Sequence, residues 1–165
     1  MPQPEADFVA ILRILAAHRV ELIVVGGVAA VAQGASIVTY DLDVVPARDP
    51  ANAERLHAAL VDLDAVYREH RPKRLEPRLE HLALPGHHLL MTRFGPLDVL
   101  GTTEMGRDYA DLTAKARVVS FDDGLRVSVL DLAEIVAIKE TSGREKDRAV
   151  LPILRRTLEE RRRVD

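Results

Sequence analysis

Asp41 and Asp43 stand two residues apart in an apolar stretch of this 165-residue chain, with Leu42 between them. Side chains two apart on a β-strand point to the same face of a sheet, so a strand over residues 37–45 would project both carboxylates together. Two parallel carboxylates repel each other unless a cation lies between them. Carboxylate oxygens suit a hard ion such as Mg²⁺, which also accepts substrate phosphates as ligands. The spacing therefore indicates a divalent-metal site for a phosphate-bearing ligand.

A third acid and a glycine pair extend this candidate site. Asp98 is the single acid in the apolar run over residues 94–100, and such an acid is costly to bury unless it is paired or binds a metal. The pair Gly26-Gly27 lacks side chains, so its backbone N–H groups could approach a phosphate closely. Three carboxylates on neighbouring strands could hold two metal ions for in-line attack on a phosphoryl group. We therefore expect two Mg²⁺ or Mn²⁺ ions at three catalytic residues, Asp41, Asp43 and Asp98.

Local patterns predict the mixed α/β elements that would place these residues. Apolar spacing, capping residues and glycine or proline stops predict helices over residues 5–18, 28–33, 51–64, 109–115, 131–141 and 146–162. Strands are predicted at residues 22–25, 37–45, 82–84, 89–94, 97–100, 118–121 and 125–129, and Asp122-Asp123-Gly124 joins the last two as a hairpin turn. The basic, proline-broken residues 68–77 are expected to be a loop. The length fits one domain over residues 1–165, helical from about residue 131.

Composition excludes several classes of function. The chain has no cysteine, which rules out disulfides, thiolate metal sites and cysteine nucleophiles. No apolar run is long enough to span a bilayer, and the N-terminus lacks the basic region of a signal peptide, so we expect a cytoplasmic protein without a membrane partner. The net charge of −3 argues against coating nucleic acid through bulk electrostatics. Residues 139–165 are locally basic, which suits either phosphate binding or a solvated helix.

The order of these motifs resembles the signature of the nucleotidyltransferase superfamily. Val25 and Gly26-Gly27 are followed, after thirteen residues, by Asp41-Leu42-Asp43-Val44. The stretch KETSGREKD, residues 139–147, resembles the branch of AbiEii/AbiGii-type toxins and their small relatives, in which a helix lysine precedes S-x-R-x-K-D. The resemblance covers residues 24–151 and leaves residues 68–85 unmatched.

The resemblance implies a nucleotidyltransferase fold, with a mixed sheet flanked by helices, and transfer of a nucleoside monophosphate from a triphosphate to an acceptor hydroxyl. Asp41 and Asp43 would bridge two Mg²⁺ ions, while Asp98 would complete one site and help to deprotonate the acceptor. Lys139 and Lys146 would neutralise the triphosphate, and Asp147 would orient Lys146. We expect neither lysine to contribute to the stability of the fold. The implied substrate-binding residues are Gly26, Gly27, Lys139, Ser142, Arg144, Lys146 and Asp147.

The identity of the partners stays open at this point. The acceptor is a tRNA end, a protein side chain or a small molecule, and by resemblance a toxin or antitoxin partner is expected. A non-catalytic, antitoxin-like or nucleotide-binding protein on the same fold is the principal alternative, because a fold alone does not establish activity. A plain structural α/β domain is the third interpretation.

Overall fold

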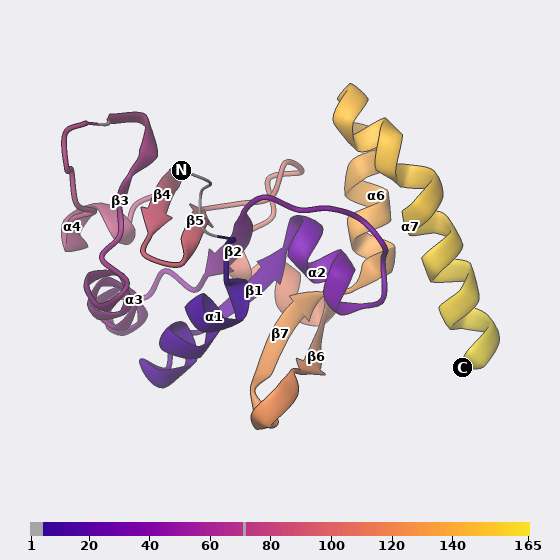
Figure 1. The fold of residues 1–165 in the computed structure, drawn as a ribbon, viewed down its shortest axis with the longest axis horizontal. Coiled ribbons are helices and arrows are strands. Elements are labelled where there is room, and N and C mark those ends of the chain that lie inside the picture. The colour runs from indigo at the N-terminus through magenta and orange to yellow at the C-terminus, as the bar shows by residue number, and fades with distance from the viewer. Residues whose placement is uncertain (1–4, 71) are drawn as a thin grey trace.

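Residues 5–70 and 72–165, the part of the chain that the computed structural model describes, form a seven-stranded mixed sheet flanked by helices (Figure 1). The strand order is β3-β4-β5-β2-β1-β7-β6. The pairs β1–β7 and β2–β5 are parallel, and the other neighbours are antiparallel. The strands are β1 (Leu22–Val25), β2 (Leu42–Pro46), β3 (Val66–Tyr67), β4 (His87–Thr92), β5 (Gly95–Leu100), β6 (Ala116–Ser120) and β7 (Arg126–Leu130).

The helices lie around this sheet, with α3 and α4 at one end of the molecule and α6 and α7 at the other (Figure 1). In the described part of the chain the α-helices are α1 (Phe8–Ala17), α2 (Gly26–Ala32), α3 (Pro50–Asp62), α4 (Leu79–Leu82), α5 (Tyr109–Leu112), α6 (Leu132–Ser142) and α7 (Glu145–Val164). Short 3₁₀ turns are η1 (Arg68–His70), η2 (Thr113–Lys115) and η3 (Asp122–Gly124). Within the described residues, no helix is both long and apolar enough to cross a membrane.

Capping side chains set several helix ends. Asp7 accepts a hydrogen bond from the backbone N–H of Ala10 at the start of α1, and Asp49 caps α3 ahead of Pro50 in the first turn. Asp131 caps α6, which ends at Gly143 in the left-handed conformation that glycine adopts without steric cost. The chain therefore turns sharply between α6 and α7, and this turn lies within residues 139–147, the basic motif.

The predicted α/β class and mixed sheet are confirmed, whereas some element boundaries are wrong. The strand predicted over residues 37–45 begins only at Leu42, because residues 37–41 pair with no neighbouring strand. The strand predicted at residues 82–84 is wrong, since Leu82 ends α4. The predicted loop over residues 68–77 begins with η1, directly after the short strand β3. The hairpin of β6 and β7 is confirmed.

Candidate active site

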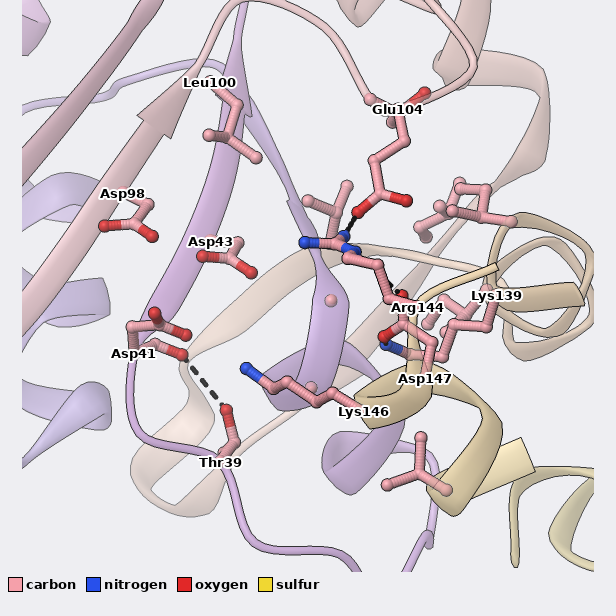
Figure 2. A pocket seen from close by; sticks show the side chains of 18 of the residues that line it. Thr39, Asp41, Asp43, Asp98, Leu100, Glu104, Lys139, Arg144, Lys146 and Asp147 are labelled. Carbon is pink, nitrogen blue, oxygen red and sulfur yellow. Dashed lines mark hydrogen bonds and ion pairs between the residues drawn. The ribbon is translucent and has the colours of Figure 1, made fainter. Parts of the chain in front are cut away.

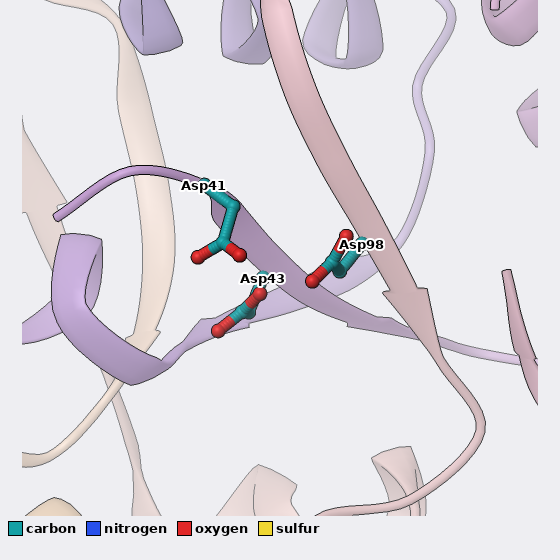
Figure 3. A group of neighbouring side chains, drawn as sticks. All are labelled: Asp41, Asp43 and Asp98. Carbon is teal, nitrogen blue, oxygen red and sulfur yellow. The ribbon is translucent and has the colours of Figure 1, made fainter. Parts of the chain in front are cut away.

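The sheet register brings the three predicted acids together. Asp43 on β2 lies directly opposite Asp98 on the parallel strand β5, and Asp41 precedes β2 by one residue. One carboxylate oxygen from each residue lies within 4.8 Å of the others (Figure 3). Asp98 is buried, while Asp41 and Asp43 are partly exposed. The cluster offers oxygen donors alone, which is the donor set that Mg²⁺ and Mn²⁺ prefer.

The glycine pair lets the first turn of α2 approach these acids. A Cβ atom at Gly26 would lie 2.5 Å from the Asp43 Oδ2 atom, and Gly26 has a φ of +69°, a conformation that disfavours other residues. A Cβ atom at Gly27 would lie 2.7 Å from the Thr39 Oγ1 atom. A side chain at either position would force a neighbour to shift, and at Gly26 the positive φ adds backbone strain.

The electrostatics of the cluster call for a cation. Burial, and then the negative charges of Asp41 and Asp98, raise the pKa of Asp43 to about 8. Burial and the charge of Asp98 also raise the pKa of Asp41. The ammonium group of Lys146 opposes both shifts without cancelling them. A divalent ion between the carboxylates would remove the repulsion, so the donor set fits a metal ion in both chemistry and charge.

Asp98 has a cationic partner that the sequence analysis missed. The Arg68 Nη1 atom lies 2.7 Å from the Asp98 Oδ1 atom, an ion pair without hydrogen-bond alignment. The same nitrogen donates a hydrogen bond of 2.6 Å to the carbonyl oxygen of Leu90 on β4. Arg68 belongs to η1, in the stretch predicted to be a loop. The burial of Asp98 is therefore compensated by an ion pair even without a metal.

Lys146 is the lysine of the basic motif that faces the acids. Its ammonium group projects towards Asp41 and Asp43 (Figure 2). It forms no ion pair with any residue in the described parts of the chain. Lys146 is thus available for a phosphate group next to the acid cluster.

The rest of the basic motif forms a network around the buried Asp147. The Lys139 Nζ atom lies 2.8 Å from the Asp147 Oδ1 atom, and the Ser142 hydroxyl donates a 2.5 Å hydrogen bond to Oδ2. The Arg144 Nε atom lies 3.3 Å from Oδ2, and the guanidinium group also pairs with Glu104. Burial by itself raises the pKa of Asp147, but these hydrogen bonds and charges lower it below its usual value. Asp147 therefore pairs with Lys139 and Arg144 instead of orienting Lys146.

This network corrects the expectation that Lys139 is irrelevant to the fold. The Lys139 side chain is 17% exposed and joins α6 to the 5% exposed Asp147 of α7. Lys139→Ala should lower stability by about 1–3 kcal/mol, because it removes the charged partner of the Asp147 Oδ1 atom while Ser142 and Arg144 still contact Oδ2. The expected fall in melting temperature is roughly 2–12 °C. Thermal denaturation checks this result.

The matched control is Arg155→Ala, which removes an exposed pair with Glu140 between the same two helices. It should change stability by less than about 1 kcal/mol. Equal melting temperatures for the Lys139→Ala variant and the wild type would show that the Lys139–Asp147 pair contributes nothing to the α6–α7 junction.

A pocket of about 420 Å³ unites the acids, the glycine pair and the basic motif (Figure 2). Nine of the ten predicted site residues line it, and Ser142 is the exception. Residues 37–40 and apolar side chains of α6 and α7 also form part of the walls. His87 also lines the pocket. The next residue, His88, does not line it, and its Nδ1 atom lies 2.7 Å from the Tyr67 hydroxyl oxygen. Glu104 and Thr39 are further lining residues that no sequence pattern singles out.

Solved structures share the fold of this chain. The lincomycin-bound crystal structure of the lincosamide antibiotic adenylyltransferase LnuA matches with a TM-score of 0.61 and 15% identity, over 90% of this chain and 94% of that one. A Thermotoga maritima protein described as a nucleotidyltransferase matches with a TM-score of 0.56 and 18% identity, over 93% and 91%. No protein-family model and no curated protein sequence matches the chain. The chain therefore has the fold of nucleotidyltransferases.

Proposed function

We propose that this protein is a metal-dependent nucleotidyltransferase, which moves a nucleoside monophosphate from a triphosphate to an acceptor hydroxyl. The observation that carries the proposal is the cluster of Asp41, Asp43 and Asp98. One carboxylate oxygen from each residue lies within 4.8 Å of the others, in a pocket that Lys146 also lines. The shared fold supports this function, because its structural neighbours are described as an adenylyltransferase and a nucleotidyltransferase.

The acids have distinct roles in the proposed reaction. Asp41 and Asp43 would hold two Mg²⁺ or Mn²⁺ ions, and Asp98 would help to complete the coordination of one of them. The bound ions would supply positive charge to the phosphate oxygens as negative charge develops there. The acceptor oxygen forms a bond to the α-phosphorus, the bond from that phosphorus to the bridging oxygen breaks, and pyrophosphate leaves. Asp98, the acid of the cluster that contacts Arg68, would accept the proton of the acceptor hydroxyl.

The basic motif and the glycine pair would together bind the triphosphate. Lys146 would contact the phosphates directly, since its ammonium group faces the acids and pairs with no described residue. Gly26 and Gly27 would let the backbone approach the β- and γ-phosphates. The remaining residues, Lys139, Ser142, Arg144 and Asp147, would hold the α6–α7 turn that presents Lys146, and Lys139 and Arg144 would add positive charge to the pocket wall.

The acceptor belongs to one of three classes: an RNA end such as that of tRNA, a protein side chain or a small molecule. The neighbour LnuA was solved with lincomycin, which makes a small hydroxylated molecule one class to include in a screen. A role beside a toxin or antitoxin partner rests on the resemblance of residues 139–147. A cytoplasmic location is part of the same proposal.

Lys146→Ala should weaken binding of a nucleoside triphosphate by about 1–3 kcal/mol, the scale of a charge-assisted hydrogen bond. This loss corresponds to a factor of about 5–150 in affinity. The ligand-free melting temperature should barely move, because Lys146 is exposed and contributes little to the fold. Calorimetry with each triphosphate and Mg²⁺ measures the change.

Arg148→Ala is the control for Lys146→Ala, since it removes another exposed cation of α7 that does not line the pocket. Its affinity should match that of the wild type. If Lys146→Ala binds triphosphates as tightly as the control does, Lys146 is not a phosphate ligand.

Incubation with each α-labelled triphosphate, Mg²⁺ and a cell extract tests the proposed function. A labelled RNA, protein or small molecule that requires Asp41 would identify both the nucleotide and the acceptor. No transfer from any of the four triphosphates to any of the three acceptor classes would favour the alternative of a non-catalytic nucleotide-binding partner.

A further inference from the structure

Arg68 joins the acid cluster from a part of the chain that carries no recognised motif. It lies in η1, within residues 68–85, the stretch unmatched by the family resemblance. Its side chain is 25% exposed and that of Asp98 is 12% exposed, so their contact is largely shielded from water. An ion pair in this setting is screened less than one on the surface.

The guanidinium group is itself fixed in position. Its Nη1 atom donates to the carbonyl oxygen of Leu90 at 2.6 Å while it lies 2.7 Å from the Asp98 Oδ1 atom. Leu90 and Asp98 lie on the neighbouring antiparallel strands β4 and β5. Arg68 therefore anchors the acid of one strand to the backbone of the next. This contact engages the Oδ1 atom of Asp98.

From this geometry we propose that Arg68 is a positioning residue, which holds the carboxylate of Asp98 in the orientation that a divalent ion needs. The assignment rests on the proposed function. Partners of this kind fix the orientation of a ligand, and their loss typically lowers metal affinity or activity by about 10–100-fold. Arg68 also offsets one of the three negative charges, so the cluster can form before a metal ion arrives.

Arg68→Gln separates the two contacts of the arginine. Glutamine retains an N–H donor for the Leu90 carbonyl but lacks the charge that faces Asp98. Calorimetric titration of the full chain with Mn²⁺ alone should show affinity about 10–100-fold below that of the wild type. Arg68→Lys, which restores the charge, should recover most of the loss. The control Arg74→Gln removes a cation six residues away, paired with the exposed Asp64, and should bind Mn²⁺ normally.

The same titration in an Asp98→Asn background tests whether Arg68 acts through Asp98. A double-mutant cycle isolates that coupling, so Arg68→Gln should have no further effect once Asp98 is neutral. If Arg68→Gln alone unfolds, the double variant, which lacks both charges of the ion pair, is compared with Asp98→Asn. Equal affinities support the assignment, and a further loss overturns it.

The wild-type titration separates the two proposals. If the wild type binds Mn²⁺ and Arg68→Gln binds it with the same affinity, the assignment of Arg68 is overturned and the proposed function stands. A wild-type chain that does not bind Mn²⁺ overturns the metal-dependent function and the assignment with it.

Discussion

Asp41→Asn is expected to abolish the rise in melting temperature that Mn²⁺ gives the wild-type protein. Binding to the folded state stabilises it by mass action, by about 2.7 kcal/mol at one hundred times the dissociation constant. For a chain of this length that is roughly 5–10 °C. Asparagine keeps the size of the side chain but removes the charge that, with Asp43 and Asp98, draws the ion into the cluster. Thermal melts with and without Mn²⁺ and a triphosphate measure the effect.

Asp62→Asn provides a matched control for this experiment. It makes the same substitution at an exposed residue that contacts His18, on α3 and outside the pocket. The control should show the full Mn²⁺ shift. If the Asp41→Asn variant shows it too, Asp41 is not a metal ligand.

Asp43→Asn should stabilise the metal-free protein while it abolishes activity, and the gain should grow with pH. The pKa of Asp43 is about 8 in the folded protein against an ordinary value of 3.8, so between these values the folded state holds a proton that the unfolded state has released. The stability that this proton contributes is present below pH 4 and is lost as the pH rises through 8. Asparagine cannot ionise and escapes this loss. A gain in stability at the expense of activity is the trade-off expected of a preorganised site.

The magnitude of this gain has an upper bound from the pKa. One pKa unit is worth about 1.4 kcal/mol, so the shift from 3.8 to about 8 corresponds to at most roughly 6 kcal/mol. Solvent screening of the partly exposed Asp43 carboxylate reduces this gain in the free energy of unfolding to a fraction of the bound. We therefore expect a gain of a few kcal/mol, or a rise in melting temperature of roughly 5–10 °C at pH 8. Urea denaturation of both proteins at pH 4.5 and pH 8, in the presence of a chelator, measures the difference. A variant less stable than the wild type at pH 8 would show that Asp43 is a structural hydrogen-bonding residue.

The acid cluster could be predicted from the sequence because its signals are local. The spacing of Asp41 and Asp43 needs only the alternation of a strand, and β2 does carry Asp43 into register with Asp98. The sequence singles out Asp98 because an acid in an apolar run must be paired or bind a metal. The structure meets that requirement in part through Arg68, a contact across 30 residues that no local pattern shows.

The partners within the basic motif could not be predicted from adjacency. Lys146 and Asp147 are consecutive, but consecutive residues of a helix do not face the same way. Asp147 therefore turns into the α6–α7 junction to meet Lys139, while Lys146 faces the acids.

The late start of β2 could not be predicted from the local pattern either. Residues 37–39 favour a strand by their side chains, yet they line the pocket and pair with no neighbouring strand.

The position of a radioactive label tests most directly whether the acid cluster transfers the α-phosphorus of a triphosphate. Each triphosphate is supplied with the label at the α- or the γ-phosphate, together with Mg²⁺, a cell extract, and either the wild-type protein or Asp41→Asn. The proposed function predicts that the wild type attaches the α-label to an acceptor, that the γ-label leaves in pyrophosphate, and that Asp41→Asn transfers neither. Transfer of the γ-label, or equal transfer by both proteins, would contradict it.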